Sequence, residues 1–97
     1  MLIVLGDATA APGRRDELVA AAREVAAATR TDEGCVSYGF FADVEDGDRI
    51  LSVEIWADRA SLDAHMTHDH THQFLRVAPG LVAGEPAMSF YEVPSVG

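Results

Sequence analysis

The chain has 97 residues, of which 48% are hydrophobic, and its formal net charge at pH 7 is -9. This length suits one domain, 1–97, and the apolar content excludes a disordered chain. Only seven Lys and Arg residues are scattered through this acidic sequence, so we expect neither nucleic acid nor an anionic membrane surface as a partner.

The chain begins with a short apolar run at residues 2–9, which predicts a first strand. Pro12 and Gly13 then interrupt the run, as these residue types punctuate secondary structure. The run lacks the basic leader and long apolar centre of a signal peptide, and no stretch reaches the roughly 20 apolar residues of a membrane span. We therefore expect a cytoplasmic protein.

A helix is predicted over residues 14–31, since apolar positions recur there at helical spacing. The residues that share this face are Leu18, Ala22, Val25 and Thr29. Asp32, Glu33 and Gly34 should end the helix, because glycine readily takes a left-handed conformation.

Residues 35–42 and 50–56 are rich in β-branched, aliphatic and aromatic side chains and predict two strands. Between them Asp46 and Gly47 form a tight-turn signal. The segment 35–56 is therefore expected to be a β-hairpin.

The remaining elements alternate between helix and strand. Asp58 is a good N-cap for a short helix that carries Leu62, His65 and Met66. The sequence then predicts, in order, a second short helix over 69–78, a stop at Pro79 and Gly80, a loop over 81–86 and a last strand over 87–93.

This order, β-α-β-β-α-β, is the ferredoxin-like pattern of an α+β domain with an antiparallel sheet. The helices of such a fold cover one face of the sheet only. The other face has to be covered by something else.

Side chains alternate along the third strand, so Leu51, Val53 and Ile55 share one face while Ser52, Glu54 and Trp56 share the other. We expect the aliphatic face to pack against the helices. If residue 43 pairs with 49, the opposite face also receives Val36 facing Trp56, Tyr38 facing Glu54 and Phe40 facing Ser52. Such a mixed aromatic and polar patch suits the lining of a ligand cavity. The alternative is plain dimer packing.

Four histidines lie close together in the sequence: His65, His68, His70 and His72. Residues 67–69 are the expected break between two helices, so one continuous ligand face is not predicted, and we expect no metal site. An imidazole near its ordinary pKa can accept a phenolic proton, unless it is a hydrogen-bonded structural group. Cys35 is expected to be a small buried or half-buried thiol without a catalytic role.

Three stretches, in order, carry a resemblance to a known family: APGRRDEL, DEGCVSYGFF and EIWADRASLDAHMTHDHTHQF. Together they resemble the antibiotic biosynthesis monooxygenase (ABM) domain family of dimeric α+β barrels. The resemblance implies a homodimer whose two sheets form one barrel, with a pocket in each subunit between sheet and helices. It also aims His65 and His70 toward that pocket.

Family members include cofactor-free oxygenases of aromatic polyketides and quinols, haem-degrading enzymes, an isomerase and proteins without known activity. In the polyketide-oxidising branch a strand-end Trp, an Asn four residues earlier and a helical Arg line the pocket. Trp56 and Arg76 match two of these positions, while Ser52 replaces the Asn. The haem-degrading pattern is matched poorly, with Asp7 in the region of its Asn and Leu75 near the position of its ligating His.

The sequence therefore predicts a monooxygenase of a small aromatic phenol or quinol that uses no metal, haem or flavin. Trp56, Tyr38, Phe40, Ser52 and Glu54 would bind the substrate; His65 or His70 would accept the proton; and Arg76 would stabilise the oxyanion. Two alternatives remain open: a non-catalytic binding module with the same cavity, and an isomerase of a small metabolite.

Overall fold

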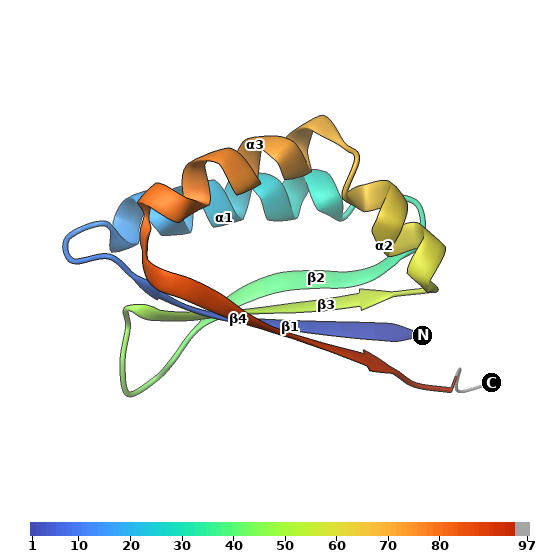
Figure 1. Cartoon of the computed structure of the whole chain (residues 1–97), viewed down its shortest axis with the longest axis horizontal. Coiled ribbons are helices and arrows are strands. Elements are labelled where there is room, and N and C mark those ends of the chain that lie inside the picture. Colours follow the sequence, from blue (N-terminus) through green and yellow to red (C-terminus); the bar gives the residue numbers. More distant parts are fainter. Residues whose placement is uncertain (95–97) are drawn as a thin grey trace.

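A computed structural model describes residues 1–94 of the chain (Figure 1). Its elements are β1 (Leu2–Ala10), α1 (Arg15–Thr29), β2 (Cys35–Ala42), β3 (Arg49–Trp56), α2 (Arg59–His65), α3 (Asp69–Val77), the 3₁₀ turn η1 (Ala78–Gly80) and β4 (Val82–Glu92). This is the predicted ferredoxin-like order, with one antiparallel sheet in the strand order β2-β3-β1-β4. No helix among the described residues is long and apolar enough to cross a membrane.

All the helices lie on one side of the sheet (Figure 1). The predicted face of α1 is confirmed, because Leu18, Ala22, Val25 and Thr29 are all buried. The Asp58 cap is confirmed as well, since its carboxylate accepts a hydrogen bond from the Ser61 backbone N–H at 2.8 Å. Local sequence signals therefore place these helices correctly.

The last strand is longer than predicted. Residues 82–86 were expected to belong to a loop, but β4 already begins at Val82, which pairs with Ala10. Gly84 has a φ of +71°, and the β1–β4 register shifts between Asp7 and Thr9. The edge of a sheet tolerates the glycine and proline residues that suggested a loop, because an edge strand pairs on one side only. The loop prediction was therefore wrong.

The predicted hairpin register is confirmed over most of its length. Tyr38 pairs with Glu54 and Phe40 with Ser52. Near its start β2 departs from this register, so that Cys35 instead of Val36 is the partner of Trp56. The irregularity turns Val36 outward, and its side chain is exposed.

The prediction of which sheet face the helices cover was wrong. Trp56, Tyr38 and Glu54 are buried on the helix side, where they pack with residues of α1 and α2. The other face carries the aliphatic row of β3 together with neighbours from the other three strands, and we call it the open face. Its apolar members are Ile3, Leu5, Phe41, Leu51, Val53, Ile55 and Tyr91.

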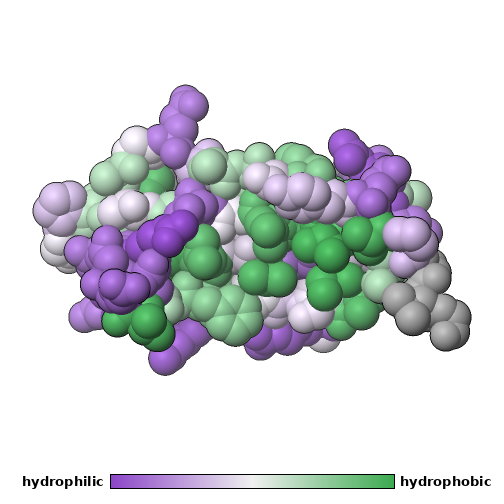
Figure 2. All heavy atoms as spheres, turned by 90° about the horizontal axis from the view of Figure 1, so that it is seen from below, coloured by the Kyte–Doolittle hydropathy of each residue, from purple (hydrophilic) through white to green (hydrophobic). Residues whose placement is uncertain are grey.

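Alternation along β3 separated the two sets of side chains correctly but carried no information on which set the helices cover. Figure 2 looks onto the open face and shows apolar side chains gathered across its middle. Leu5 is 39% exposed and Phe41 57% exposed on this face. An apolar surface of this kind is typical of an interaction site.

Candidate functional site

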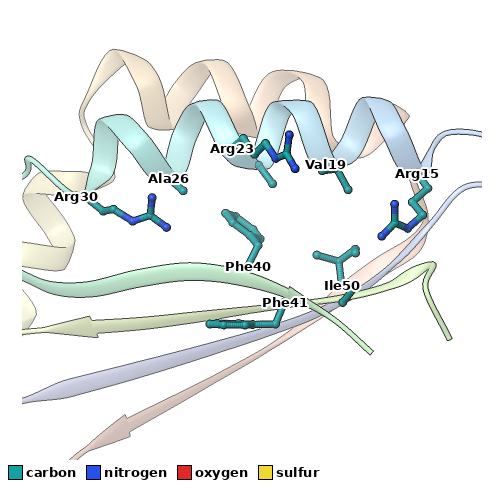
Figure 3. Close-up of a pocket in the computed structure, with 10 residues that line it drawn as sticks. Arg15, Val19, Arg23, Ala26, Arg30, Phe40, Phe41 and Ile50 are labelled. Carbon is teal, nitrogen blue, oxygen red and sulfur yellow. The ribbon is translucent and has the colours of Figure 1, made fainter. Parts of the chain in front are cut away.

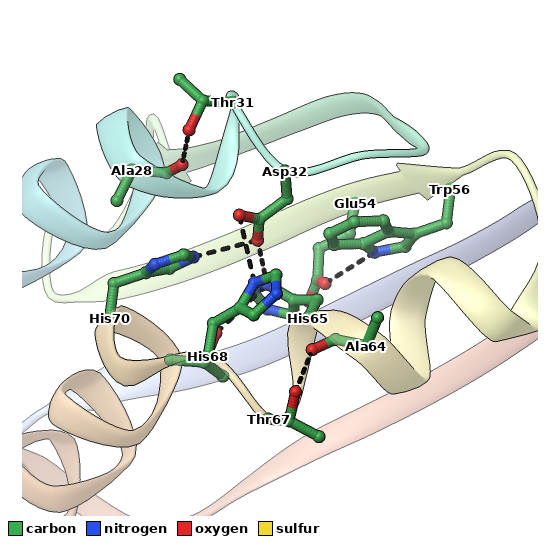
Figure 4. Close-up of polar contacts among 11 residues, drawn as sticks. Ala28, Thr31, Asp32, Glu54, Trp56, Ala64, His65, Thr67, His68 and His70 are labelled. Atoms are coloured by element: carbon green, nitrogen blue, oxygen red, sulfur yellow. Dashed lines mark hydrogen bonds and ion pairs between the residues drawn. The ribbon is translucent and has the colours of Figure 1, made fainter.

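Three histidines converge on one carboxylate (Figure 4). His65 Nδ1 and His70 Nε2 each lie 2.9 Å from Asp32 Oδ2, and His68 Nδ1 lies 3.2 Å from Asp32 Oδ1. His65 ends α2, His68 caps α3 and His70 lies in its first turn. The helix break was expected to prevent one continuous ligand face along a single helix. The histidines instead meet from the end of α2 and the start of α3, because the chain turns there around Asp32.

Asp32 belongs to the turn between α1 and β2, and that turn is fixed against α2. Gly34 has a φ of +79°, and a Cβ atom on it would collide with the Ser61 side chain. The Ala57 backbone N–H also donates a hydrogen bond of 2.8 Å to the Gly34 carbonyl oxygen. Glycine therefore satisfies both the left-handed backbone and the close approach, and the approach brings Asp32 to the end of α2.

The sequence analysis missed Asp32 as a site residue. It interpreted Asp32 only as part of a helix stop, because 33 residues separate it from His65 along the chain. No local spacing rule connects positions so far apart. The available signal was a carboxylate two residues before a glycine that fixes the path of the turn.

His65 is the central residue of the site. Its side chain is 4% exposed, and its ring lies 4.7 Å from the Trp56 ring and 5.8 Å from the Tyr38 ring, centroid to centroid. The Thr71 hydroxyl lies 3.2 Å from Nδ1. His65 is thus held between a carboxylate on one side and aromatic rings of the sheet on the other.

Aromatic contacts continue along the layer between sheet and helices. Tyr38 and Phe40 meet edge to face at 5.6 Å, and Phe40 contacts Phe74 of α3 at 5.7 Å. Trp56 exposes no surface at all, and its indole N–H donates a 3.0 Å hydrogen bond to Glu54 Oε1. These contacts join Trp56, Glu54, Tyr38 and Phe40 to His65 in one layer.

Burial and hydrogen bonding shift the pKa values of this layer. Burial raises the pKa of Glu54 more than the Trp56 hydrogen bond lowers it, and burial likewise raises the pKa of the Tyr38 phenol. Burial lowers the pKa of His65 in spite of the opposing effect of Asp32. Burial would raise the pKa of Asp32, but the neighbouring imidazoles of His65, His70 and His68 outweigh it and leave that pKa lowered.

The other predicted site residues lie at the margins. Ser52 is half-buried on the helix side of β3, where a Cβ atom on Gly6 would collide with its hydroxyl. Arg76 is exposed in the last turn of α3 and is not among the residues grouped around Asp32. His72 is also exposed and lies outside this group.

A hollow of about 390 Å³ lies elsewhere, between α1 and the edge of the sheet (Figure 3). Arg15, Arg23 and Arg30 border it from α1, and Phe40 and Ile50 border it from the sheet. Arg15 donates to the Gly47 carbonyl oxygen at 2.7 Å, and Arg30 to the Tyr38 carbonyl oxygen at 3.0 Å. Two of the three guanidinium groups thus already have hydrogen-bond partners within the fold.

Comparisons with known proteins agree with this architecture. A solved structure described as an antibiotic biosynthesis monooxygenase superposes with a TM-score of 0.90 at 24% identity, covering 98% of this chain and all (100%) of the other. A Pseudomonas aeruginosa protein superposes with a TM-score of 0.88 at 26% identity, covering 97% of this chain and 94% of the other.

Among curated proteins, an uncharacterised protein of Synechocystis is 28% identical over 92 residues. The match covers 95% of this chain but only 63% of the relative, so the chain spans less than two thirds of that protein. The sequence profile of the antibiotic biosynthesis monooxygenase family matches residues 1–77, from β1 to the end of α3. The chain therefore belongs to the antibiotic biosynthesis monooxygenase (ABM) family.

Proposed function

We propose that this protein is a monooxygenase that oxidises a small aromatic phenol or quinol, with His65 as the proton acceptor and Asp32 as its positioning residue. The observation that carries the proposal is the buried Asp32–His65 pair, 2.9 Å apart, whose imidazole lies 4.7 Å from the Trp56 ring, centroid to centroid. Membership of a family described by monooxygenase activity supports the same reaction class.

The pair suits general-base chemistry. When the Nδ1–H of His65 donates a hydrogen bond to Asp32, the lone pair on Nε2 is free to accept a proton. Burial lowers the pKa of His65, which keeps the ring neutral and competent as a base near neutral pH. Asp32 also offsets part of the cost of the imidazolium that forms after proton transfer.

The remaining chemistry belongs to the substrate and to oxygen. A phenolate or its carbanion form can donate electrons to O₂ and form a carbon–oxygen bond. Loss of water from the resulting hydroperoxide leaves a carbonyl group, so that one oxygen atom enters the product and the other leaves as water. The protein has to hold the ring, favour the anion and exclude bulk water. We assign the holding of the substrate ring to Trp56, Tyr38 and Phe40. Ser52 and Glu54 would be the polar members of the pocket wall. His70 would be a second imidazole near the substrate ring.

Substrate entry requires a movement, because Trp56 exposes no surface. The segment from His65 to His70 is the natural part to open, since His68 and His70 have side chains 40% and 27% exposed. Ligand binding should then change the fluorescence of Trp56, the single tryptophan of the chain. Amide hydrogen exchange should change in residues 65–70 on ligand binding.

Oxygen consumption with a panel of hydroquinones and anthrones tests the reaction class. For a substrate so found, His65→Gln should lower kcat by roughly 10²-fold or more, the usual contribution of a general base. His72→Gln is the matched control, because His72 is exposed outside the site. Full activity of His65→Gln would refute the proton-acceptor role. Ligand binding without oxygen consumption across the panel would favour the binding-module alternative.

We also propose that the protein acts as a homodimer through the open face. Half-exposed aliphatic side chains of β1 and β3 and the exposed rings of Phe41 and Tyr91 form an apolar surface that the chain itself leaves uncovered. A second copy of the same face would cover it symmetrically. The sequence predicted the interface on the opposite face, which carries Trp56. In the proposed dimer the partner would instead cover Leu5 and Val53 on the open face.

A further inference from the structure

The group around Asp32 has the composition of a metal site as well as that of a catalytic pair. One ligand atom from each of Asp32, His65, His68 and His70 lies within 4.8 Å of the other three. Three imidazoles and one carboxylate are ligands that zinc-type divalent ions favour. The four residues come from three separate segments, the α1–β2 turn, the end of α2 and the start of α3.

His68 provides an independent sign that the group can bind a cation. Its Nδ1 atom is buried and has no hydrogen-bond partner, although Asp32 Oδ1 is only 3.2 Å away. Buried ring nitrogens normally have a partner. Asp32 already accepts hydrogen bonds from His65 and His70, while His68 Nδ1 has none. A cation among the four residues would give His68 Nδ1 a partner.

We propose that Asp32, His65, His68 and His70 bind one divalent transition-metal ion of the zinc type, which fastens the α2–α3 connection to the α1–β2 turn. Tetrahedral bonds of about 2.0–2.1 Å set ligand atoms roughly 3.3 Å apart. The present spread of up to 4.8 Å therefore has to shrink by at most about 1.5 Å. The net charge of -9 favours cation uptake. The partly exposed rings of His68 and His70 provide the entry side.

The metal site does not depend on the proposed function, but a bound ion would interfere with that function. An ion on Nδ1 of His65 leaves the remaining ring proton on Nε2, so the imidazole can no longer accept a proton from a phenol. The ion would also hold closed the segment that covers Trp56. The metal-bound form should be more stable and inactive as an oxygenase.

The test uses the tag-free chain of residues 1–97, stripped with a chelator and titrated with Co²⁺ in the absence of substrate. We expect visible d–d absorption that saturates at one Co²⁺ per chain, displacement by Zn²⁺, and a Zn²⁺-dependent rise in the melting temperature. His68→Ala and His70→Ala, both at partly exposed positions, should each weaken Co²⁺ binding at least tenfold while keeping the circular dichroism spectrum. His72→Ala is the matched control and should bind like the wild type.

Absence of saturable Co²⁺ and Zn²⁺ binding at micromolar concentrations would overturn the metal site and leave the proposed function untouched. Wild-type affinity in both His68→Ala and His70→Ala would also overturn it, as would an equal loss in His72→Ala. On a confirmed substrate, Zn²⁺ at saturation should abolish oxygen consumption, and chelator should restore it. Unchanged turnover at full Zn²⁺ occupancy would refute His65 as a ligand.

Discussion

The two faces of the sheet differ in how far the chain itself covers them. On the helix side Trp56 and Val4 are 0% and 1% exposed, whereas on the open face Leu5 and Phe41 are 39% and 57% exposed. Both faces are apolar, but only the helix side carries a buried carboxyl group and the imidazole of His65. The chain therefore covers its aromatic and polar layer by itself and leaves its aliphatic layer uncovered, where we propose that a partner binds.

The largest expected effect comes from Trp56→Ala. Removing a fully buried indole leaves a cavity and should lower the free energy of unfolding by roughly 3–5 kcal/mol. Phe41→Ala on the open face should cost about 1 kcal/mol or less in the monomer, because much of the ring is already exposed. Urea unfolding at low protein concentration measures both values. Equal losses would contradict the difference between the two faces.

The second effect concerns assembly. Val53 lies in the middle of the open face, paired with Leu5 and Gly39. Val53→Asp would bury a carboxylate in the proposed interface and should raise the dimer dissociation constant by roughly 100-fold. Size-exclusion chromatography with light scattering gives the mass. Val44→Asp is the control, since Val44 is 100% exposed. A monomeric wild type at micromolar concentration would refute the dimer.

A smaller effect is expected at Glu54 on the helix side. Burial raises the folded-state pKa of Glu54 above the ordinary value of 4.5. At a pH between 4.5 and the raised pKa, the folded state holds a proton that the unfolded state has lost. Stability must therefore fall as the pH rises through that window. Glu54→Gln keeps an acceptor for the Trp56 N–H and removes the buried charge.

Glu54→Gln should consequently be more stable than the wild type at pH 8, on the order of 1 kcal/mol, and equally stable at pH 4. Urea unfolding across this pH range checks the difference. Glu85→Gln, on the exposed stretch of β4, controls for the loss of one negative charge. A variant that is less stable than the wild type at pH 8 would show that the Glu54 carboxylate is stabilising.

The smallest effect is expected from Arg49→Gln at the solvent edge. Arg49 forms ion pairs with Asp7 at 2.7 Å and Asp43 at 2.9 Å, and the hydrogen bonds from Arg49 lower the pKa of Asp7. The stabilisation from the Asp7–Arg49 ion pair is present above the ordinary pKa of Asp7. It is lost as the pH falls through the lowered pKa that Asp7 has in the folded state. The variant should be slightly less stable at pH 7, with a difference that shrinks in high salt. Thermal melts at low and high salt measure it, and a difference independent of salt would contradict an electrostatic origin.

Much of the fold could be predicted from local signals. The bounds of β2 and the buried face of α1 agree with the prediction, and Asp58 caps α2 as expected. Each of these features depends on residues a few positions apart, where periodicity and capping chemistry act directly. The prediction failed at residues 82–86, because the sheet edge at β4 tolerates the glycine and proline that suggested a loop.

The candidate site was only partly predictable. The sequence indicated His65, His70 and Trp56, and the structure brings His65 and His70 together on Asp32, with the Trp56 ring in contact with that of His65. Asp32 was not indicated, and the expected helix break argued only against one continuous ligand face. Convergence depends on how the α1–β2 turn packs against α2, and no spacing rule describes a contact between segments 33 residues apart.

The sequence by itself determined the order of the elements, the alternation along β3 and the separation of an aliphatic row from an aromatic and polar one. Only the tertiary structure decided which row the helices cover and which side chains meet at Asp32. Alternation is symmetric with respect to the two faces of a sheet, so it cannot choose between them. The choice follows from the side on which α1, α2 and α3 pack together, where Trp56 and Tyr38 join Val25, Ala26 and Leu62 in one core.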